Sequence, residues 1–289
     1  MNRREFVQVA ALAPAAAQAP AAAFRFVHFT DTHMQPELGA REGIEKAFAA
    51  VSAEKPDFAL GGGDLLMDLD SCGPDRAKQL WNLYLNARKG LTMPVKEVPG
   101  NHDVYGLSPN SKVPANDPQY GKKMFEEKIG PRYQSFDHKG WHFILLDSIG
   151  AVGRQFIGEI DEAQLAWLKD DLAKTGPQTP IVVLTHIPLA TAMLPFLRQN
   201  QPMESLVVKN AREVLEVLSR YNVKAVLQGH THIREVVHYQ GCQYITSGAV
   251  SGNWWRGERL GHPEGYAVLT VEGESIRWEY KTYGWRARA

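Results

Sequence analysis

Hydrophobic residues recur along this chain with two spacings, one typical of buried strands and one of amphipathic helices. Short apolar runs that end in a polar motif predict strands at residues 24–31, 58–64, 94–100, 181–186 and 223–230. Apolar residues three or four positions apart predict helices at residues 40–55, 75–89, 161–173 and 204–220. Strands that alternate with helices in this way are typical of α/β folds.

The middle and the end of the chain follow other patterns. Residues 105–120 are rich in Pro, Asn, Ser and Gly and predict a long loop, and residues 133–148 predict a hairpin that turns at Lys139 and Gly140. The last quarter alternates like antiparallel strands, at residues 235–240, 242–248, 265–273 and 275–283. Strands alternating with helices, followed by a run of strands, predict an α/β sandwich with mixed sheets. No linker interrupts the pattern, so residues 24–289 are expected to form one domain.

The first 23 residues differ in composition from the rest. The pair Arg3 and Arg4 precedes an Ala-rich run, in which Ala17 and Ala19 form an A-x-A pattern suited to signal cleavage. Residues 1–23 therefore resemble a twin-arginine export signal, which predicts a periplasmic protein. The alternative is a disordered Ala/Pro tail with a chance arginine pair.

Composition limits the class of protein. Hydrophobic content is 44% and charged content 22% over 289 residues, which is ordinary for a globular protein. Basic and acidic residues number 32 each, so bulk charge gives no sign of a nucleic-acid polymer as partner. No apolar run is long enough for a mature transmembrane helix, so stable membrane insertion is not expected. Oligomeric state stays open.

The two cysteines, Cys72 and Cys242, stand outside any CxxC pair. A zinc site built from cysteines is therefore not expected. Their separation in sequence does not decide whether they form a disulfide.

Five short motifs that each end a predicted strand hold eight residues of metal-site type, namely Asp31, His33, Asp64, Asn101, His102, His186, His230 and His232. The motifs are Asp31-x-His33, Gly63-Asp64, Gly100-Asn101-His102-Asp103, His186 and Gly229-His230-x-His232. Each motif alone has a simpler explanation, such as a turn, a cap or a structural histidine. In open α/β sheets, however, ligands bind at the carboxyl ends of strands, where all five motifs lie. Carboxylate, amide and imidazole groups brought together there would suit one or two divalent metals.

Two of the motifs place a pair of candidate ligands two residues apart. If the D-x-H and H-x-H segments are extended, the two side chains of each pair point to the same side of the backbone. Each pair would then direct both of its side chains to the same side of its segment, which is a common arrangement in metal-binding sites.

The ordered set of motifs resembles the calcineurin-like metallophosphoesterase superfamily, over most of the chain from Asp31 to His232. The resemblance implies a four-layer α/β/β/α sandwich of two mixed β-sheets flanked by helices. It implies one metal held by Asp31, His33, Asp64 and His232, and a second held by Asp64, Asn101, His186 and His230. The cofactors would be two divalent ions, and Mn, Fe, Zn and Co all accept such ligands.

The same resemblance implies a mechanism. A hydroxide held between the two metals would attack phosphorus. His102 would sit near the leaving-group oxygen, as a general acid or an electrostatic stabiliser. Asp103 would orient His102 or a metal ligand.

A second group of candidates follows the motifs. Trp254, Trp255 and Arg256 are expected to form a substrate lip, because indoles stack on bases or sugars and Arg pairs with phosphate. The alternative is a hydrophobic corner with exposed charges. His28 is expected to be a core or sheet residue, and His142 has no motif context and is assigned no function.

The function that the resemblance implies is metal-dependent hydrolysis of a small-molecule phosphoester. A phosphodiester such as a cyclic nucleotide or a glycerophosphodiester is the first expectation. A phosphomonoester of a small metabolite is the alternative. A non-catalytic, metal-bound interaction scaffold is less expected, because that would require decay of a ligand or of His102, and all are present.

Overall fold

The computed structural model describes residues 23–197 and 201–288. The predicted export signal lies outside these residues, apart from Ala23. Within the described part of the chain, no helix is both long enough and apolar enough to cross a membrane.

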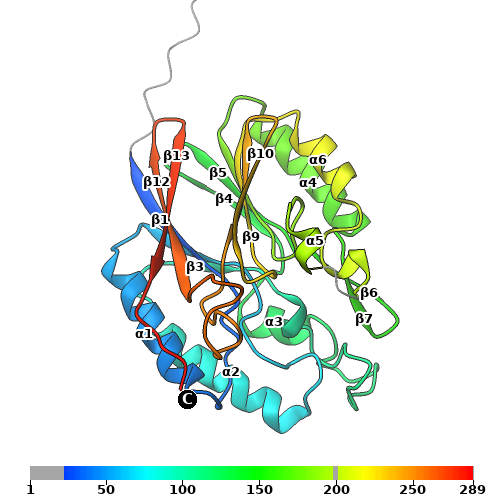
Figure 1. The fold of residues 1–289 in the computed structure, drawn as a ribbon. Coiled ribbons are helices and arrows are strands. Elements are labelled where there is room, and N and C mark those ends of the chain that lie inside the picture. The colour runs from blue at the N-terminus through cyan, green and yellow to red at the C-terminus, as the bar shows by residue number, and fades with distance from the viewer. Residues whose placement is uncertain (1–22, 198–200, 289) are drawn as a thin grey trace, which may run out of the picture.

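Two large mixed sheets pack face to face, and helices cover both outer faces (Figure 1). The first sheet has five strands, in the order β13 (Ser275–Thr282), β12 (Gly265–Glu272), β1 (Phe24–Phe29), β2 (Phe58–Gly61) and β3 (Val95–Glu97). The second has six, in the order β10 (Arg234–Tyr239), β11 (Cys242–Ser247), β9 (Val223–Gln228), β8 (Ile181–Leu184), β5 (Trp141–Leu145) and β4 (Gln134–His138). The predicted sandwich of two mixed sheets flanked by helices is therefore confirmed.

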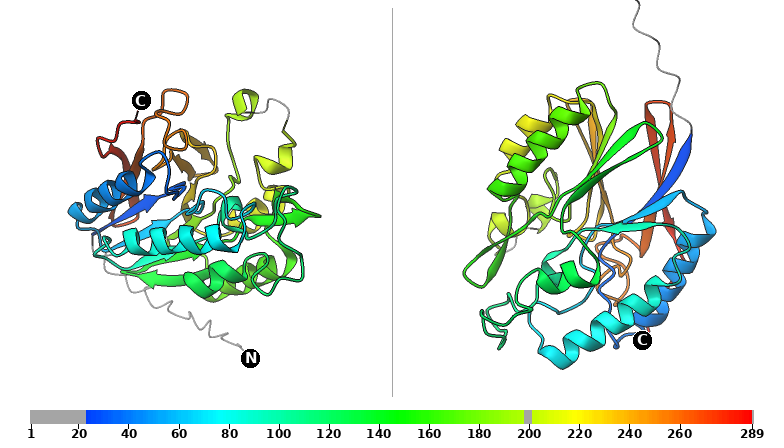
Figure 2. Two further views of the ribbon diagram at one scale, coloured as in Figure 1. Left: turned by 90° about the horizontal axis from the view of Figure 1, so that it is seen from below. Right: turned by 180° about the vertical axis from the view of Figure 1, so that it is seen from behind.

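The helices lie on opposite sides of the sandwich, as Figure 2 shows from two further directions. Those beside the first sheet are α1 (Ala40–Ala53) and α2 (Pro74–Arg88), and those beside the second are α4 (Glu162–Thr175) and α6 (Ala211–Leu218). The shorter elements are the 3-10 helices η1 (Asn101–Asp103) and η2 (Met203–Ser205), the helices α3 (Lys123–Lys128) and α5 (Leu194–Leu197), and a small hairpin of β6 (Ile149–Val152) and β7 (Gln155–Gly158).

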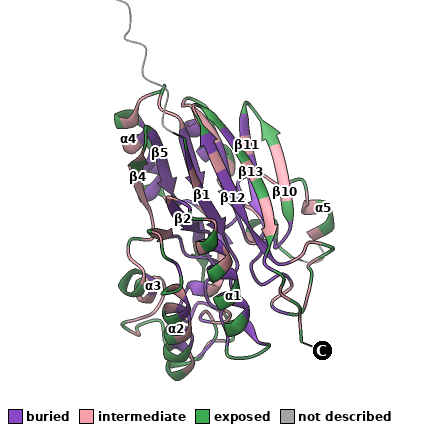
Figure 3. Cartoon of the chain, turned by 90° about the vertical axis from the view of Figure 1, so that its left-hand side faces the viewer, coloured by how far each residue is buried: buried purple, intermediate pink, exposed green. Residues whose placement is uncertain are grey.

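Successive side chains of β1 point to opposite faces of the first sheet, so this strand contributes to two layers of hydrophobic core. Phe24 and Phe26 face the second sheet, whereas Val27 and Phe29 join the cluster beneath α1 and α2. Between the sheets the aromatic rings pack directly, with ring centroids of Phe26 and Phe58 5.1 Å apart. A third cluster lies beneath α4 and α6. The central strands are consequently buried and the edge strands β10 and β13 more exposed (Figure 3).

Strand direction determines where the loops after the strands gather. The neighbours β1, β2 and β3 are parallel to one another, as are β5, β8 and β9 in the second sheet. Parallel strands end at the same edge of a sheet, so the loops that follow them lie together. All five sequence motifs stand in such loops.

The helix predicted at residues 204–220 is only half correct, since α6 begins at Ala211. Residues 203–205 form the short 3-10 helix η2, and the residues directly before α6 form hydrogen bonds with other segments instead of a helix. The Val208 amide donates to the carbonyl of Pro188 at 3.0 Å, and the Lys209 amide donates to that of Gly158 at 2.8 Å. Backbone groups engaged in this way cannot join a helical ladder.

Other local predictions are confirmed. Residues 133–148 form the hairpin β4–β5, with positive φ at the turn residues Lys139 and Gly140. Cys72 and Cys242 are both buried and free, in different core clusters, which answers the open question of a disulfide.

Candidate metal centre

The five motifs converge where the strands end. Asp31 and His33 follow β1, Asp64 follows β2, Asn101 and His102 lie in η1 after β3, His186 follows β8, and His230 and His232 follow β9. Most of these side chains are fully buried although all are polar. Polar groups removed from water need partners, so what each group contacts decides its role.

The first group consists of Asp31, His33 and His232, whose ligand atoms lie within 4.8 Å of one another. The Nε2 atoms of His33 and His232 face each other at 3.0 Å. The Nδ1 atom of His232 donates to the carbonyl of Gly252 at 2.6 Å, which leaves its Nε2 lone pair directed into the group. Burial lowers the pKa of His33 well below its usual range. Two imidazole nitrogens that face each other in this way suit a cation placed between them.

The second group consists of Asp64, Asn101, His186 and His230. The Nδ1 atom of His186 donates to the carbonyl of Gly62 at 2.7 Å, and the Nε2 atom of His230 donates to that of Ser205 at 2.8 Å. In the described chain, Nδ1 of His230 has no hydrogen-bond partner. Burial lowers the pKa of His230 to about 4, so this nitrogen keeps a free lone pair. Each ring is fixed through one nitrogen and presents the other.

Asp64 lies between the two groups. Its Oδ2 atom is 3.6 Å from Nε2 of His33 and 3.3 Å from Nε2 of His186. Although burial opposes ionisation, His186 and His102 hold the pKa of Asp64 well below its usual range. Burial likewise opposes protonation of His186, but Asp64 and Asp31 outweigh it and raise the pKa of His186 to about 9. A divalent cation would displace that proton, since metal ligation requires the deprotonated ring.

The backbone of the ligands is strained. Positive φ values occur at Asp31 (55°), His33 (43°), Asp64 (50°), His230 (69°) and His232 (60°). The prediction that the D-x-H and H-x-H segments are extended is therefore wrong. Residues other than glycine adopt this conformation at a cost of about 1–3 kcal/mol each, and such residues cluster at functional sites. The strain is consistent with a site selected for ligand placement.

Asp103 connects the loops rather than contacting the reacting region. Its carboxylate accepts hydrogen bonds from the backbone amides of Leu65, Leu66 and Gly100, at 2.9–3.1 Å. Gly100 is required there, because a Cβ at this position would lie 2.1 Å from Oδ1 of Asp64. Of the two predicted roles of Asp103, the structure favours orienting a metal ligand, Asp64.

His102 instead faces Asp70, a residue to which no sequence motif assigned a role. The Nδ1 atom of His102 lies 3.7 Å from Oδ1 of Asp70, and the rings of His102 and His33 lie 4.9 Å apart. Burial opposes protonation, but Asp64 and Asp70 raise the pKa of His102. Asp70 follows Asp64 by six residues in a loop without a recognisable motif, so only the folded chain reveals this contact.

The residues of the predicted substrate lip lie in different environments. Trp255 is buried at 1% exposure, and its indole nitrogen lies 3.1 Å from the carbonyl oxygens of Thr32 and His33. This burial contradicts a substrate contact by Trp255. The Trp255 side chain instead packs beneath the loop that carries the candidate ligands Asp31 and His33. Arg256 is exposed.

Trp254 remains a candidate for substrate contact. Its ring is half-buried, with its centroid 4.5 Å from that of His232 and 6.0 Å from that of His33. The guanidinium of Arg259 lies 4.9 Å from the ring centroid of Trp254. An aromatic surface therefore borders the first group of ligands.

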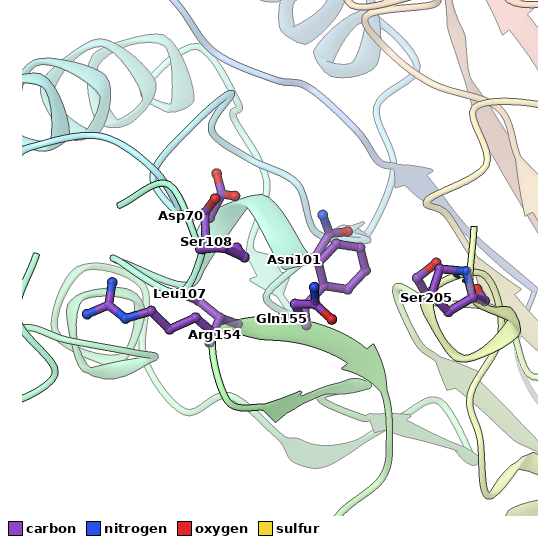
Figure 4. Close-up of a pocket in the computed structure, with 10 residues that line it drawn as sticks. Asp70, Asn101, Leu107, Ser108, Arg154, Gln155 and Ser205 are labelled. Atoms are coloured by element: carbon purple, nitrogen blue, oxygen red, sulfur yellow. Dashed lines mark hydrogen bonds between the residues drawn. The ribbon is translucent and has the colours of Figure 1, made fainter. Parts of the chain in front are cut away.

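A cavity of about 260 Å³ opens beside the second group (Figure 4). Asn101 lies near its centre, with Asp70 and Ser108 on one side and Ser205 on the other. The centre thus has room for a small molecule next to the candidate ligands.

Comparison with known families agrees with this geometry. A family model described as Calcineurin-like phosphoesterase matches residues 24–234, and one described as C terminal of Calcineurin-like phosphoesterase matches residues 245–289. The second match contains β12 and β13, which complete the first sheet beside β1.

Similar proteins are found among curated sequences and solved structures. The 3′,5′-cyclic adenosine monophosphate phosphodiesterase CpdA of Haemophilus influenzae is 28% identical, over 80% of this chain and 78% of its own. A 3′,5′-cyclic-nucleotide phosphodiesterase of Nostoc is 29% identical, over 73% of this chain and 74% of its own. A dimetal phosphatase from Danio rerio shares the fold, with a TM-score of 0.61 and 16% identity over 92% of this chain and all of its own.

Proposed function

The chain belongs to the calcineurin-like phosphoesterase family, and on that premise we propose that it hydrolyses 3′,5′-cyclic nucleotides with two divalent cations. It is a metal-dependent phosphoesterase with a divalent metal site. The observation that carries the proposal is the position of Asp64 between two groups of ligands. A carboxylate shared in this way supports a pair of cations rather than one.

The residues present fit such a pair. Asp31, His33 and His232 would hold one cation, and Asn101, His186 and His230 the other, with Asp64 shared. Oxygen and imidazole nitrogen donors suit divalent Mn, Fe, Zn or Co. Cations bound there would polarise the phosphate oxygens and lower the pKa of a water molecule.

The remaining residues would act on the leaving group and the substrate. Burial opposes protonation of His102, but the neighbouring Asp64 and Asp70 raise its pKa, and the ring lies beside the shared Asp64. It would donate a proton to the departing oxygen or stabilise the charge that develops there. Asp70 would hold His102 in place from its other side. Trp254 would contact the sugar or base.

A small diester is the substrate class that the surroundings support. The cavity of about 260 Å³ is close to the lower end of the about 300–1,000 Å³ found for small-molecule sites. Relatives that share most of their length with this chain are named for cyclic-nucleotide hydrolysis. A cyclic nucleotide combines a phosphodiester with a compact body, and it therefore matches both observations.

The test compares substrates on protein of known metal content. Purified protein loaded separately with Mn, Zn, Fe or Co would be assayed with 3′,5′-cyclic AMP, bis(p-nitrophenyl) phosphate and p-nitrophenyl phosphate. We expect cyclic AMP and the diester to be hydrolysed in preference to the monoester, with about two metal ions per chain.

Other outcomes point elsewhere. A preference for the monoester would make the protein a phosphomonoesterase. Two bound metals without turnover of any ester would favour an interaction scaffold. One metal per chain at full activity would contradict the shared role of Asp64.

A further inference from the structure

The cavity beside the second group of ligands has walls that the chemistry described so far does not use. They come from three segments that are distant in sequence: the loop after η1, the β6–β7 hairpin and η2. Leu107 and Pro109 belong to the loop, Phe156 to β7, and Pro202 and Ser205 to the region of η2. Three segments meeting around one space form a built pocket rather than a surface groove.

The cavity lies where the leaving part of a substrate would be. Asn101, a candidate ligand, and Asp70, which faces His102, both line it. The ring of Phe156 also reaches the centre, since its centroid is 6.0 Å from that of the candidate ligand His230. A group that occupies the cavity therefore lies next to the candidate ligand Asn101 and to Asp70, the residue that His102 faces.

The lining favours a flat group with apolar faces and polar edges. Leu107, Pro109, Pro202 and Phe156 offer apolar surface. Polar groups stand at separate points, Asp70 and Ser108 on one side and Gln155 below Asn101 (Figure 4). A nucleobase has this distribution, with two apolar faces and hydrogen-bonding edges. Glycerol has no apolar face, so it would gain nothing from these walls.

Phe156 is held in position by the hairpin that carries it. The Arg154 guanidinium, in the turn before it, donates to three carbonyl oxygens of the neighbouring loop, those of Gly106, Ser111 and Val113. At the other end of β7, Gly158 pairs with Val208. A ring fixed before the ligand arrives loses little freedom on binding, which favours affinity.

We propose that this cavity is the subsite for the base of a nucleotide, and that Phe156 is the face on which the base stacks. The inference rests on the proposed function, since it names what part of a nucleotide ester the site recognises. Gln155 and Ser108 would contact the edge of the base. Phe156 is then a binding residue that distinguishes nucleotides from esters of simple alcohols.

A binding experiment tests this without turnover. Adenosine 5′-monophosphate and ribose 5-phosphate share a sugar and a phosphate and differ in the base. Calorimetric titration of each into metal-loaded protein would give two dissociation constants. We expect the nucleotide to bind about 5- to 150-fold more tightly, the range that stacking of one base on an aromatic ring supplies.

Three substitutions at one position separate stacking from packing. Phe156→Ala should bring the two dissociation constants close together, and Phe156→Tyr should keep them apart. Phe156→Leu retains apolar volume without an aromatic face, so it should lose most of the difference while the melting temperature stays near the wild-type value. Val152→Ala, on the same hairpin but 65% exposed, is the matched control and should leave the ratio unchanged.

Specific binding results would overturn the assignment of Phe156 to base stacking. Equal binding of the two ligands by the wild-type protein would overturn it. A difference that survives in Phe156→Leu and Phe156→Ala would also overturn it, and loss of the difference in Trp254→Ala alone would assign the base to Trp254. The proposed function fails separately, if cyclic AMP is not hydrolysed while the nucleotide still binds through Phe156.

Discussion

Two clusters of histidine and carboxylate in the described part of the chain differ in how their nitrogen atoms are used. In the His142 cluster (Asp137, His142 and Asp171), Nδ1 of His142 lies 2.6 Å from Asp137 and Nε2 lies 2.8 Å from Asp171. Both ring nitrogens are thus satisfied by carboxylates. In the metal centre, ring nitrogens of His33 and His232 face each other at 3.0 Å instead. Histidine and carboxylate side chains therefore connect strands in the His142 cluster, whereas in the metal centre they form a set of candidate ligands.

Backbone conformation separates the two clusters as well. His142 lies within β5, opposite Asp137 of β4 in regular antiparallel register. Asp31 and His232, by contrast, lie after strands and have positive φ. Strain at the ligands must be stabilised by the rest of the fold, whereas the His142 cluster is compatible with an ordinary sheet. Hydrogen-bond partners and backbone strain together distinguish a candidate binding site from a structural histidine–carboxylate contact.

The largest effect is expected from removing the carboxylate that the two groups share. Asp64→Asn keeps the size of the side chain but removes its charge, so the metal content should fall and kcat/KM should drop by more than the about 10- to 100-fold typical of losing an outer-shell partner. Elemental analysis and kinetics on the same preparation measure both.

Asp171→Asn in the His142 cluster is the matched control for this substitution. It makes the same chemical change to a carboxylate that contacts a histidine, yet it should leave metal content and kcat/KM at their wild-type values. Unchanged metal content in Asp64→Asn would refute its shared role.

The next largest effect is expected at His102, where catalysis and metal binding can be measured separately. His102→Ala should lower kcat by about 10²–10⁴-fold while the metal content stays intact, because His102 is proposed to assist the leaving group rather than to hold a cation. Full activity with metal bound would exclude this role. Loss of metal in this variant would move His102 into the ligand set.

The smallest expected effect lies in the other cluster and concerns stability alone. His142→Gln removes the imidazole that bonds to the carboxylate of Asp171, which is mostly buried, and should lower the free energy of unfolding by about 1–3 kcal/mol. For a chain of this size that corresponds to roughly 2–4 °C in melting temperature per kcal/mol. Denaturation curves with and without metal would measure it. A fall in metal content would contradict the assignment of His142 to structure.

Much of the fold was predictable because local patterns determine it. The alternation of apolar residues located the central strands, and helical spacing located α1, α2 and α4. The failure at residues 204–210 has a physical cause. Val208 and Lys209 donate their amides to Pro188 and Gly158, which are far away in sequence, and this pairing outweighs helix formation. The helix propensity of a segment carries no information about hydrogen-bond partners that are distant in sequence.

The sequence by itself determined which residue types follow each strand, and with them the candidate ligands and the class of chemistry. Those residues lie at strand ends because the chain must turn there, which is a local property. Only the tertiary structure decided that Trp255 is a core residue, that Asp70 faces His102, and that Phe156 borders a cavity. These contacts join segments from different loops, and their distances depend on how two sheets pack. Spacing along one chain does not encode such distances.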